Sequence, residues 1–321
     1  MPDLQMKANT LSISKLIVCL VLLVLLIGQW KSFSSFYSKP VTLDSRWLLL
    51  GIWVLLLAPF NWYLECLRLR SAMTTGKDHT ITDFWKIVMS GFTLGFITPA
   101  RLGDYAGRAV MVPNKSTEIV MATWVAGLCQ NWFNVVAGMV GALYLFFHFH
   151  NPYLLPVILI SGLLLSVISI LLCYPHGRRV LFDSLVFFVK KYLKFLRVPE
   201  YLRVSNAGTV NPKLFLFSGL RYIIYLTQYL IIANAMGILA PGILLVSIIS
   251  TILLIQSMLP LPFIAGLLSR AEISSLIWSL ILVPFDKALT VSFIIWMINL
   301  MLPALIGLKY VLSLNPMREI H

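Results

Sequence analysis

The sequence predicts an all-α, polytopic membrane helix bundle, and three observations support this prediction. Hydrophobic residues make up 59% of the 321 residues and charged residues only 12%, about half the charged fraction of a typical soluble domain. The mean hydropathy is +0.89. Long apolar runs recur along the chain, and a helix needs about 20 apolar residues to cross a bilayer. We therefore expect a single integral membrane domain, 1–321, with about six full spans and two broken hairpins.

Six apolar runs are long enough to form the full spans. The first follows Lys7 and Lys15 and resembles a signal-peptide core. Gly28-Gln29-Trp30 is a poor cleavage site, so we expect an uncleaved first helix. The six predicted spans are 14–30, 46–66, 119–147, 153–174, 213–236 and 288–310.

Two further apolar runs do not fit a simple crossing. Residues 84–98 form a run of about 15 residues, which is short for the hydrocarbon core. Residues 242–283 form a longer run that Pro260 and Pro262 interrupt. Each run is therefore predicted to be a re-entrant or broken helical hairpin.

The distribution of basic residues predicts the orientation. The segment 175–213 contains eight Lys and Arg against two acidic residues, whereas the connections 148–153 and 236–242 contain no Lys or Arg. By the positive-inside rule the first is cytoplasmic and the other two are external, which places both termini in the cytoplasm of a multi-pass inner-membrane protein. Residues 178–197 are amphipathic at helical period and are predicted to lie on the inner leaflet; the alternative is an extension of the preceding span.

The net charge of +13 favours membrane lipids with anionic headgroups as partners, because the basic residues gather at the ends of apolar runs. No basic groove with interleaved aromatic residues is present, so a nucleic-acid partner is not expected. The four cysteines are widely spaced and are predicted to be packing residues. His148 and His150 are two residues apart, a poor metal pair, and no metal or cofactor is expected.

The order span, span, broken hairpin, span occurs once before residue 150 and again after it. The predicted halves are about 1–150 and 151–321. Pro99 and Gly103 mark the first break, and Pro262 and Gly266 mark the second with the same spacing. With three full crossings in each half, the second half would be inverted relative to the first. Discontinuous helices at matching positions of inverted halves predict a transport site near the membrane midplane.

The first break carries an unusual group of charges for an apolar chain. Arg101, Asp104 and Arg108 are spaced i, i+3 and i+7, so on a helix they share one stripe and Asp104 can pair with both arginines. Gly103 and Gly107, like Gly91 and Gly95, are spaced to let two helices approach closely. We interpret the stretch as the tip and return limb of a hairpin that holds a positive site; the alternative is a cytoplasmic loop whose arginines contact lipid phosphates.

The second break carries Arg270 and Glu272, which do not face each other on a helix. They need partners elsewhere, either in a site shared with the first hairpin or at separate interfaces. Glu65 and Arg68 are interpreted as a structural ion pair at the end of a span. In the span 119–147, three neutral amides can bond between helices or contact a headgroup: Gln130, Asn131 and Asn134.

The segment "TPARLGDYAGRAVMV" resembles the lysylphosphatidylglycerol synthase transmembrane-region family, a flippase-like membrane module. Its motif P-x-R-x-G-[DE]-x-x-x-R is similar to the residues Pro99, Arg101, Gly103, Asp104 and Arg108. Asp104 stands where Glu is usual in the family.

A later motif of this family, rich in leucine, proline and glycine, is similar to Pro262, Gly266 and Glu272. Phe263 and Ile264 stand where glycines are usual. The resemblance covers nearly the whole chain. It implies lipid translocation without the soluble synthase domain, so no synthase activity is expected.

Together, these observations predict a lipid flippase or lipid transporter for a phospholipid or polyprenyl-linked lipid. Arg101, Arg108 and Arg270 would bind a phosphate group. Asp104 and Glu272 would hold these arginines in the empty site and could engage a cationic headgroup. The alternative is an integral-membrane enzyme, or an accessory subunit that associates with cell-envelope enzymes in lipid-linked glycan biosynthesis. An enzyme is not expected, because the sequence shows no convincing nucleophile, acid/base pair or metal cluster.

Overall fold

The computed structural model describes residues 45–74, 79–98, 101–192, 209–258 and 266–313, together with Leu20, Val24 and Ile27. Every regular element in this part of the chain is a helix, so the predicted all-α membrane bundle is confirmed. Five helical segments are long and apolar enough to span a membrane: Leu50–Ala72, Pro113–Phe149, Leu154–Cys173, Pro212–Ala235 and Phe285–Leu312.

These five segments match the last five predicted spans. The first predicted span, 14–30, lies almost entirely outside the described residues. The helices are α2 (Ser45–Ala72), α3 (Ile81–Ile97), α4 (Leu102–Val110), η3 (Pro113–Lys115), α5 (Ser116–Phe149), α6 (Leu154–Cys173), α7 (Pro175–Tyr192), α8 (Pro212–Ala235), α9 (Gly242–Met258), α10 (Gly266–Trp278), η4 (Ser279–Ile281), α11 (Phe285–Trp296), the π-helical turn η5 (Met297–Met301) and α12 (Leu302–Leu312).

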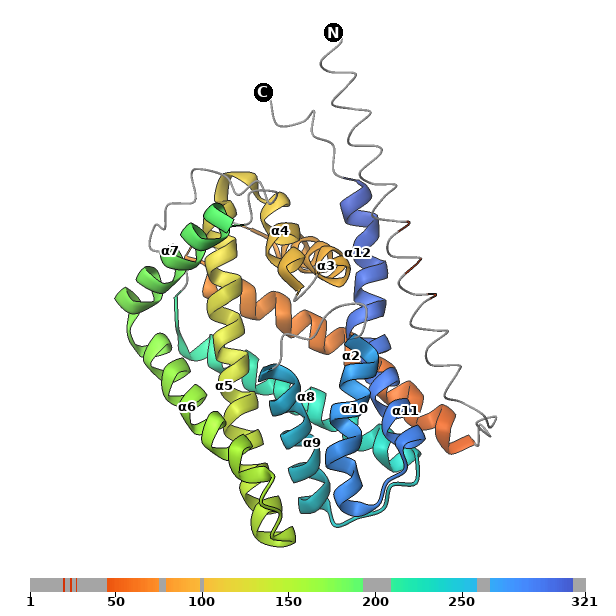
Figure 1. Ribbon diagram of the computed structural model, residues 1–321. Coiled ribbons are helices and arrows are strands. Elements are labelled where there is room, and N and C mark those ends of the chain that lie inside the picture. Colours follow the sequence, from red (N-terminus) through yellow and green to blue (C-terminus); the bar gives the residue numbers. More distant parts are fainter. Residues whose placement is uncertain are drawn as a thin grey trace.

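Helices α2 and α8 pack side by side and cross the bundle obliquely, while α5 and α6 form an antiparallel pair along one flank (Figure 1). Helices α3 and α4 lie at one end of the molecule. Helix α9 begins, and α10 ends, at the opposite end (Figure 1). The two short helix pairs therefore enter the bundle from opposite ends, in the arrangement expected for two broken hairpins.

Both pairs consist of helices too short to cross a bilayer. Helices α3 and α9 have 17 residues each, or about 26 Å of helix against a hydrocarbon core of about 30 Å. Pro99 and Pro262, the proposed break residues, lie outside the described part of the chain. Gly266 is the first residue of α10.

The glycines of the first hairpin allow α3 and α4 to pack backbone against backbone. A Cβ atom on Gly103 would collide with the Leu94 carbonyl group, and one on Gly107 would lie 2.6 Å from the Ser90 carbonyl oxygen. On the facing helix, a Cβ on Gly95 would come within 3.0 Å of the Asp104 Cβ. Close packing of these small residues is the physical basis of the predicted tight hairpin.

The hairpins also pack reciprocally on the last span of the other half. Helix α9 packs on α5, and α3 packs on α12. Each contact again uses a glycine, since Gly141 lies against the Ser247 carbonyl and Gly307 against the Met89 carbonyl. Two halves with the same order of helices would give this reciprocal packing.

Local sequence signals define the ends of several helices. Helix α3 begins with a capping box in which the Thr80 hydroxyl accepts from the Asp83 amide and the Asp83 carboxylate accepts from the Thr80 amide. The Thr80 hydroxyl also donates to this carboxylate at 2.6 Å, which lowers the pKa of Asp83. Helix α8 begins with Asn211 as the N-cap and Pro212 at the first position, the preferred residues there.

Helices α6 and α7 are separate rather than one continuous rod. Tyr174 between them has an extended backbone, and α7 turns away from α6 at this point (Figure 1). The first part of the predicted amphipathic segment 178–197 therefore forms its own helix. Its residues 193–197 lie outside the described part of the chain.

Candidate ligand-binding cavity

A cavity of about 310 Å³ lies within the bundle, between the two hairpins and the helices α2, α5, α8 and α11. Its charged lining consists of five arginines and two carboxylates, a net formal charge of +3. Charges inside a membrane bundle are costly, at about 2.5–3.5 kcal/mol for one residue at the bilayer centre on insertion scales, and require partners or water. The charged lining residues are Glu65, Arg68, Arg101, Asp104, Arg108, Arg221 and Arg270.

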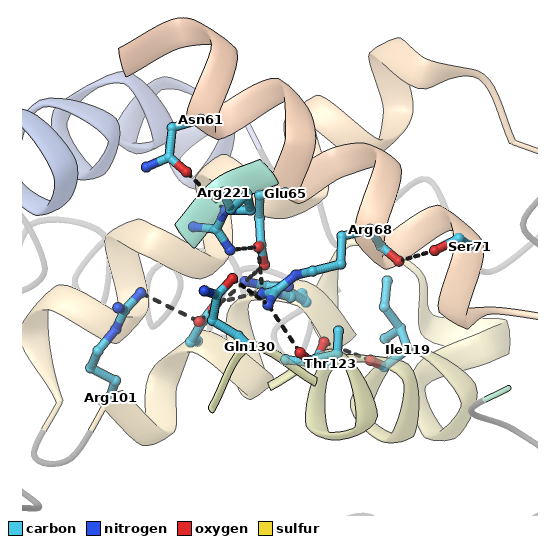
Figure 2. Close-up of polar contacts among 12 residues, drawn as sticks. Asn61, Glu65, Arg68, Ser71, Arg101, Ile119, Thr123, Gln130 and Arg221 are labelled. Carbon is cyan, nitrogen blue, oxygen red and sulfur yellow. Dashed lines mark hydrogen bonds and ion pairs between the residues drawn. The ribbon is translucent and has the colours of Figure 1, made fainter. Parts of the chain in front are cut away.

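Glu65 of α2 is the centre of a buried ionic cluster. Its carboxylate accepts from Arg68 at 2.5 Å, from Arg108 at 2.9 Å and from Arg221. Figure 2 shows Arg68 and Arg221 approaching Glu65 from α2 and α8. Because Arg108 belongs to α4, one carboxylate connects three helices. The side chain of Glu65 is only 2% exposed.

Asp104 holds Arg108 from within the first hairpin. The Arg108 Nε donates to Asp104 Oδ1 at 2.7 Å, and Nη2 donates to Oδ2 at 3.2 Å, a two-pronged ion pair. Arg108 is thus bound by Asp104 and Glu65 together. Its Nη1, however, is buried and has no hydrogen-bond partner. An unsatisfied buried guanidinium nitrogen favours an external acceptor such as a ligand or water.

Arg101 lies at the start of α4 with left-handed backbone angles, φ 58° and ψ 27°. A non-glycine residue seldom adopts this conformation, and such strain is frequent at ligand sites. The side chain is 42% exposed and reaches Asp104 only at 3.5 Å. Its guanidinium lies 5.5 Å from the centre of the Phe92 ring. Arg101 is therefore held more loosely than Arg108.

Arg270 of α10 enters the cavity from the second hairpin. Among the described residues its guanidinium makes one hydrogen bond, from Nη1 to the Gln256 Oε1, at a long 3.4 Å. No carboxylate lies within ion-pair distance of Arg270 among the residues that the structure describes. Gln256 is held in turn by the Arg270 carbonyl and by Ser274. Arg270 therefore presents an uncompensated positive charge to the cavity.

Helix α5 contributes a polar stripe to the same cavity. It runs over 12 residues, or about 16 Å of helix. Its polar residues are Thr123, Gln130, Asn131 and Asn134, and Gly127 lies among them. Gln130 accepts from Arg68 Nη1 at 3.3 Å, as Figure 2 shows. The side-chain amides of Asn131 and Asn134 bond to no group within the described residues. Of the three amides predicted to bond between helices, Gln130 does so with Arg68 of α2, and Asn131 and Asn134 do not within the described residues.

The structure brings most of the predicted site residues together. Seven of the eight predicted substrate-binding residues line this one cavity: Arg101, Asp104, Arg108, Gln130, Asn131, Asn134 and Arg270.

Glu272 lies apart from these seven residues. It is exposed on α10 and does not line the cavity. Residues two positions apart on a helix, such as Arg270 and Glu272, point about 200° away from each other. Glu272 cannot hold Arg270 in place. The interpretation of Glu65 and Arg68 as a simple ion pair is too narrow, since Glu65 also binds Arg108 and Arg221.

Several lining residues were not singled out from the sequence. Arg221 could have been predicted, because a charged residue inside a predicted span is by itself a reason to expect a functional site there. Tyr225 and Tyr229 follow Arg221 on the same face of α8, at i+4 and i+8. They and Gln256 gave no separate signal, since aromatic and amide residues are common in membrane helices.

Comparison with protein-family models and with curated protein sequences gives no match. The resemblance to the lysylphosphatidylglycerol synthase transmembrane region thus stays a prediction. Within the described residues, no group of three or more His, Cys, Asp or Glu side chains could hold a metal ion. What the geometry offers is an electropositive, amide-lined chamber among membrane helices.

Proposed function

We propose that the protein is a lipid flippase or lipid transporter of the inner membrane that binds a phosphate-containing headgroup in this cavity. The observation that carries the proposal is Arg270, which faces a cavity of net charge +3 without a carboxylate partner among the described residues. Guanidinium groups match phosphate oxygens in a forked geometry. The substrate would be a phospholipid or a polyprenyl-linked lipid whose chains stay in the bilayer.

The two hairpins suggest how the headgroup would cross. They enter from opposite ends of the bundle, and both contribute arginines to the cavity: Arg101 and Arg108 from the first hairpin and Arg270 from the second. A headgroup bound between them would be about midway across the membrane, as in transporters with broken helices. Small movements of each hairpin against its partner span, α12 or α5, would open the cavity to one side at a time.

Asp104 would act as an internal competitor for the substrate phosphate. It holds Arg101 weakly, at 3.5 Å, and Arg108 strongly, at 2.7 Å. An entering phosphate could therefore take over Arg101 at low cost while the Glu65 cluster stays intact. Because only the weak Arg101–Asp104 pair would break, the helix bundle would stay stable while the lipid is bound and released.

A headgroup-accessibility assay tests this proposal. The protein is reconstituted into liposomes with fluorescent phosphatidylglycerol, and a membrane-impermeant quencher reports how fast the label moves between leaflets. Arg270→Gln should slow this movement at least about tenfold, as expected for one lost charge-assisted hydrogen bond. Arg179→Gln, which removes an exposed arginine on α7, should have no effect.

Equal rates for the wild type and Arg270→Gln would remove Arg270 from the mechanism. The lipid recovered from the same liposomes also tests the predicted alternative. A covalently altered lipid in mass spectra would favour a membrane enzyme instead of a transporter.

A further inference from the structure

The neutral part of the cavity lining carries more information about the headgroup than the arginines do. Besides the charged residues and the tyrosines, the cavity lining contains seven neutral side chains with hydroxyl or amide groups. Four are on α5 and three on α9 and α11. Phosphate recognition by arginine does not require them. A surface of this kind instead suits a ligand with several hydroxyl groups.

Two of these side chains are open for a ligand. The amides of Asn131 and Asn134 line the cavity but make no hydrogen bond within the part of the chain that the structure describes. Each amide can donate two hydrogen bonds and accept two. Polar groups left unpaired in a membrane bundle favour a bound partner or water.

Aromatic rings line the same cavity as these amides. Tyr225 and Tyr229 of α8 and Trp296 of α11 line the same chamber, and aromatic residues with a polar tip bury one face while still reaching a hydroxyl group. Tyr229 is almost fully buried, at 2% exposure. A sugar or polyol offers both the apolar C–H faces and the hydroxyl groups that such a mixed surface contacts.

The cavity offers no free carboxylate to a cationic headgroup among the described residues. Both cavity carboxylates are already engaged, Glu65 by three arginines and Asp104 by Arg101 and Arg108. The face of the Phe92 ring is covered by Arg101. With a net charge of +3 on the lining, an ammonium group would be repelled.

Building on the proposed function, we infer that the cavity selects headgroups that join a phosphodiester to a hydroxyl-bearing glycerol, polyol or sugar and rejects headgroups with an added cation. Arg270 and Arg101 bind the phosphate, and the α5 amides bind the hydroxyl groups. This selectivity is opposite to that expected for an aminoacylated lipid.

The test is native mass spectrometry of the full-length protein in detergent with four dioctanoyl lipids. These are phosphatidic acid, phosphatidylglycerol, phosphatidylinositol and lysyl-phosphatidylglycerol. The wild type should bind phosphatidylglycerol and phosphatidylinositol about tenfold more tightly than the other two, the effect expected of one or two hydrogen bonds. The double variant Asn131→Ala/Asn134→Ala should lose the preference over phosphatidic acid and keep its affinity for phosphatidic acid, because only the contacts with the hydroxyl groups are removed.

The control is Asn114→Ala, which removes an exposed amide in η3 outside the cavity and should keep the preference. The lipid series in the wild type tests the inference without any variant. Lysyl-phosphatidylglycerol binding as tightly as phosphatidylglycerol, or a preference unchanged in the double variant, would overturn the inference but not the proposed function. Failure to bind any of the four phospholipids would overturn the inference and also exclude a phospholipid as the substrate of the proposed transporter.

Discussion

Arg108 and Arg270 face the same cavity from different hairpins, but their surroundings differ. The side chain of Arg108 is 2% exposed and forms ion pairs with Asp104 and Glu65. Arg270 has one long bond to an amide and no carboxylate partner among the described residues. The same side chain is thus used in two ways, because Asp104 and Glu65 both pair with Arg108 and no described carboxylate pairs with Arg270.

Arg108 therefore has a structural role as part of an ion-pair network, whereas Arg270 is available to bind a ligand. Removing one partner of a buried ion pair leaves an uncompensated charge and is strongly destabilising. Removing a buried charge that has no ionic partner costs little folding free energy and can even relieve repulsion. Stability and ligand affinity should therefore respond oppositely at the two ends of the cavity.

The largest change in stability is expected at the end of the cavity where the arginines are paired with Glu65 and Asp104. Glu65→Gln would leave three arginines without their shared carboxylate and should lower the free energy of unfolding by about 3–5 kcal/mol. Thermal unfolding of the detergent-solubilised protein measures this change. Glu272→Gln, the same substitution at an exposed site, should leave the melting temperature unchanged. Equal melting temperatures for both variants would show that the Glu65 cluster is not structural.

A smaller effect is expected where the first hairpin closes. Gly107→Ala would place a methyl group 2.6 Å from the Ser90 carbonyl oxygen, and overpacking of this kind costs about 1–3 kcal/mol. Gly127→Ala is the matched control, because nothing lies within 4 Å of its Cβ position. Alanine there should stabilise α5 by up to about 1 kcal/mol through helix propensity. Equal destabilisation by both substitutions would contradict the close packing of α3 and α4.

The smallest change in stability is expected at the other end of the cavity, where Arg270 has no carboxylate partner among the described residues. Arg270→Gln should shift the free energy of unfolding by less than about 1 kcal/mol, since the guanidinium makes a single long bond, to Gln256, within the described part of the chain. Binding of short-chain phosphatidylglycerol should nevertheless fall at least about tenfold. The same two measurements on Arg108→Gln should show a large loss of stability. Similar losses of stability in the two variants would remove the distinction between the two ends.

Much of the fold follows from the sequence because membrane helices are defined by length and hydropathy. The runs 84–98 and 242–283 were recognised as broken because one is short and the other is interrupted by proline. The pairing of Asp104 with Arg108 follows from spacing along one helix. These are local properties, and local properties can be read from one sequence.

The contacts between helices could not be predicted in the same way. The bond from Arg221 to Glu65 joins residues 156 positions apart, and no spacing rule connects α2 to α8. Glu65 therefore looked like the partner of Arg68 alone. For Glu272, the sequence pattern gave the acidic residue but not the face of α10 on which it lies.

The most direct test of the central claim asks whether an anionic headgroup occupies the cavity. A single cysteine is placed at Gly127, which lines the cavity and has room for a side chain, after the four native cysteines are replaced by alanine. The control is a cysteine at the exposed position Glu272. Short-chain phosphatidylglycerol should slow labelling of Cys at position 127 by a water-soluble thiol reagent and leave position 272 unaffected, and Arg270→Gln should abolish the protection. Labelling of position 127 at the same rate with and without the lipid would contradict the account.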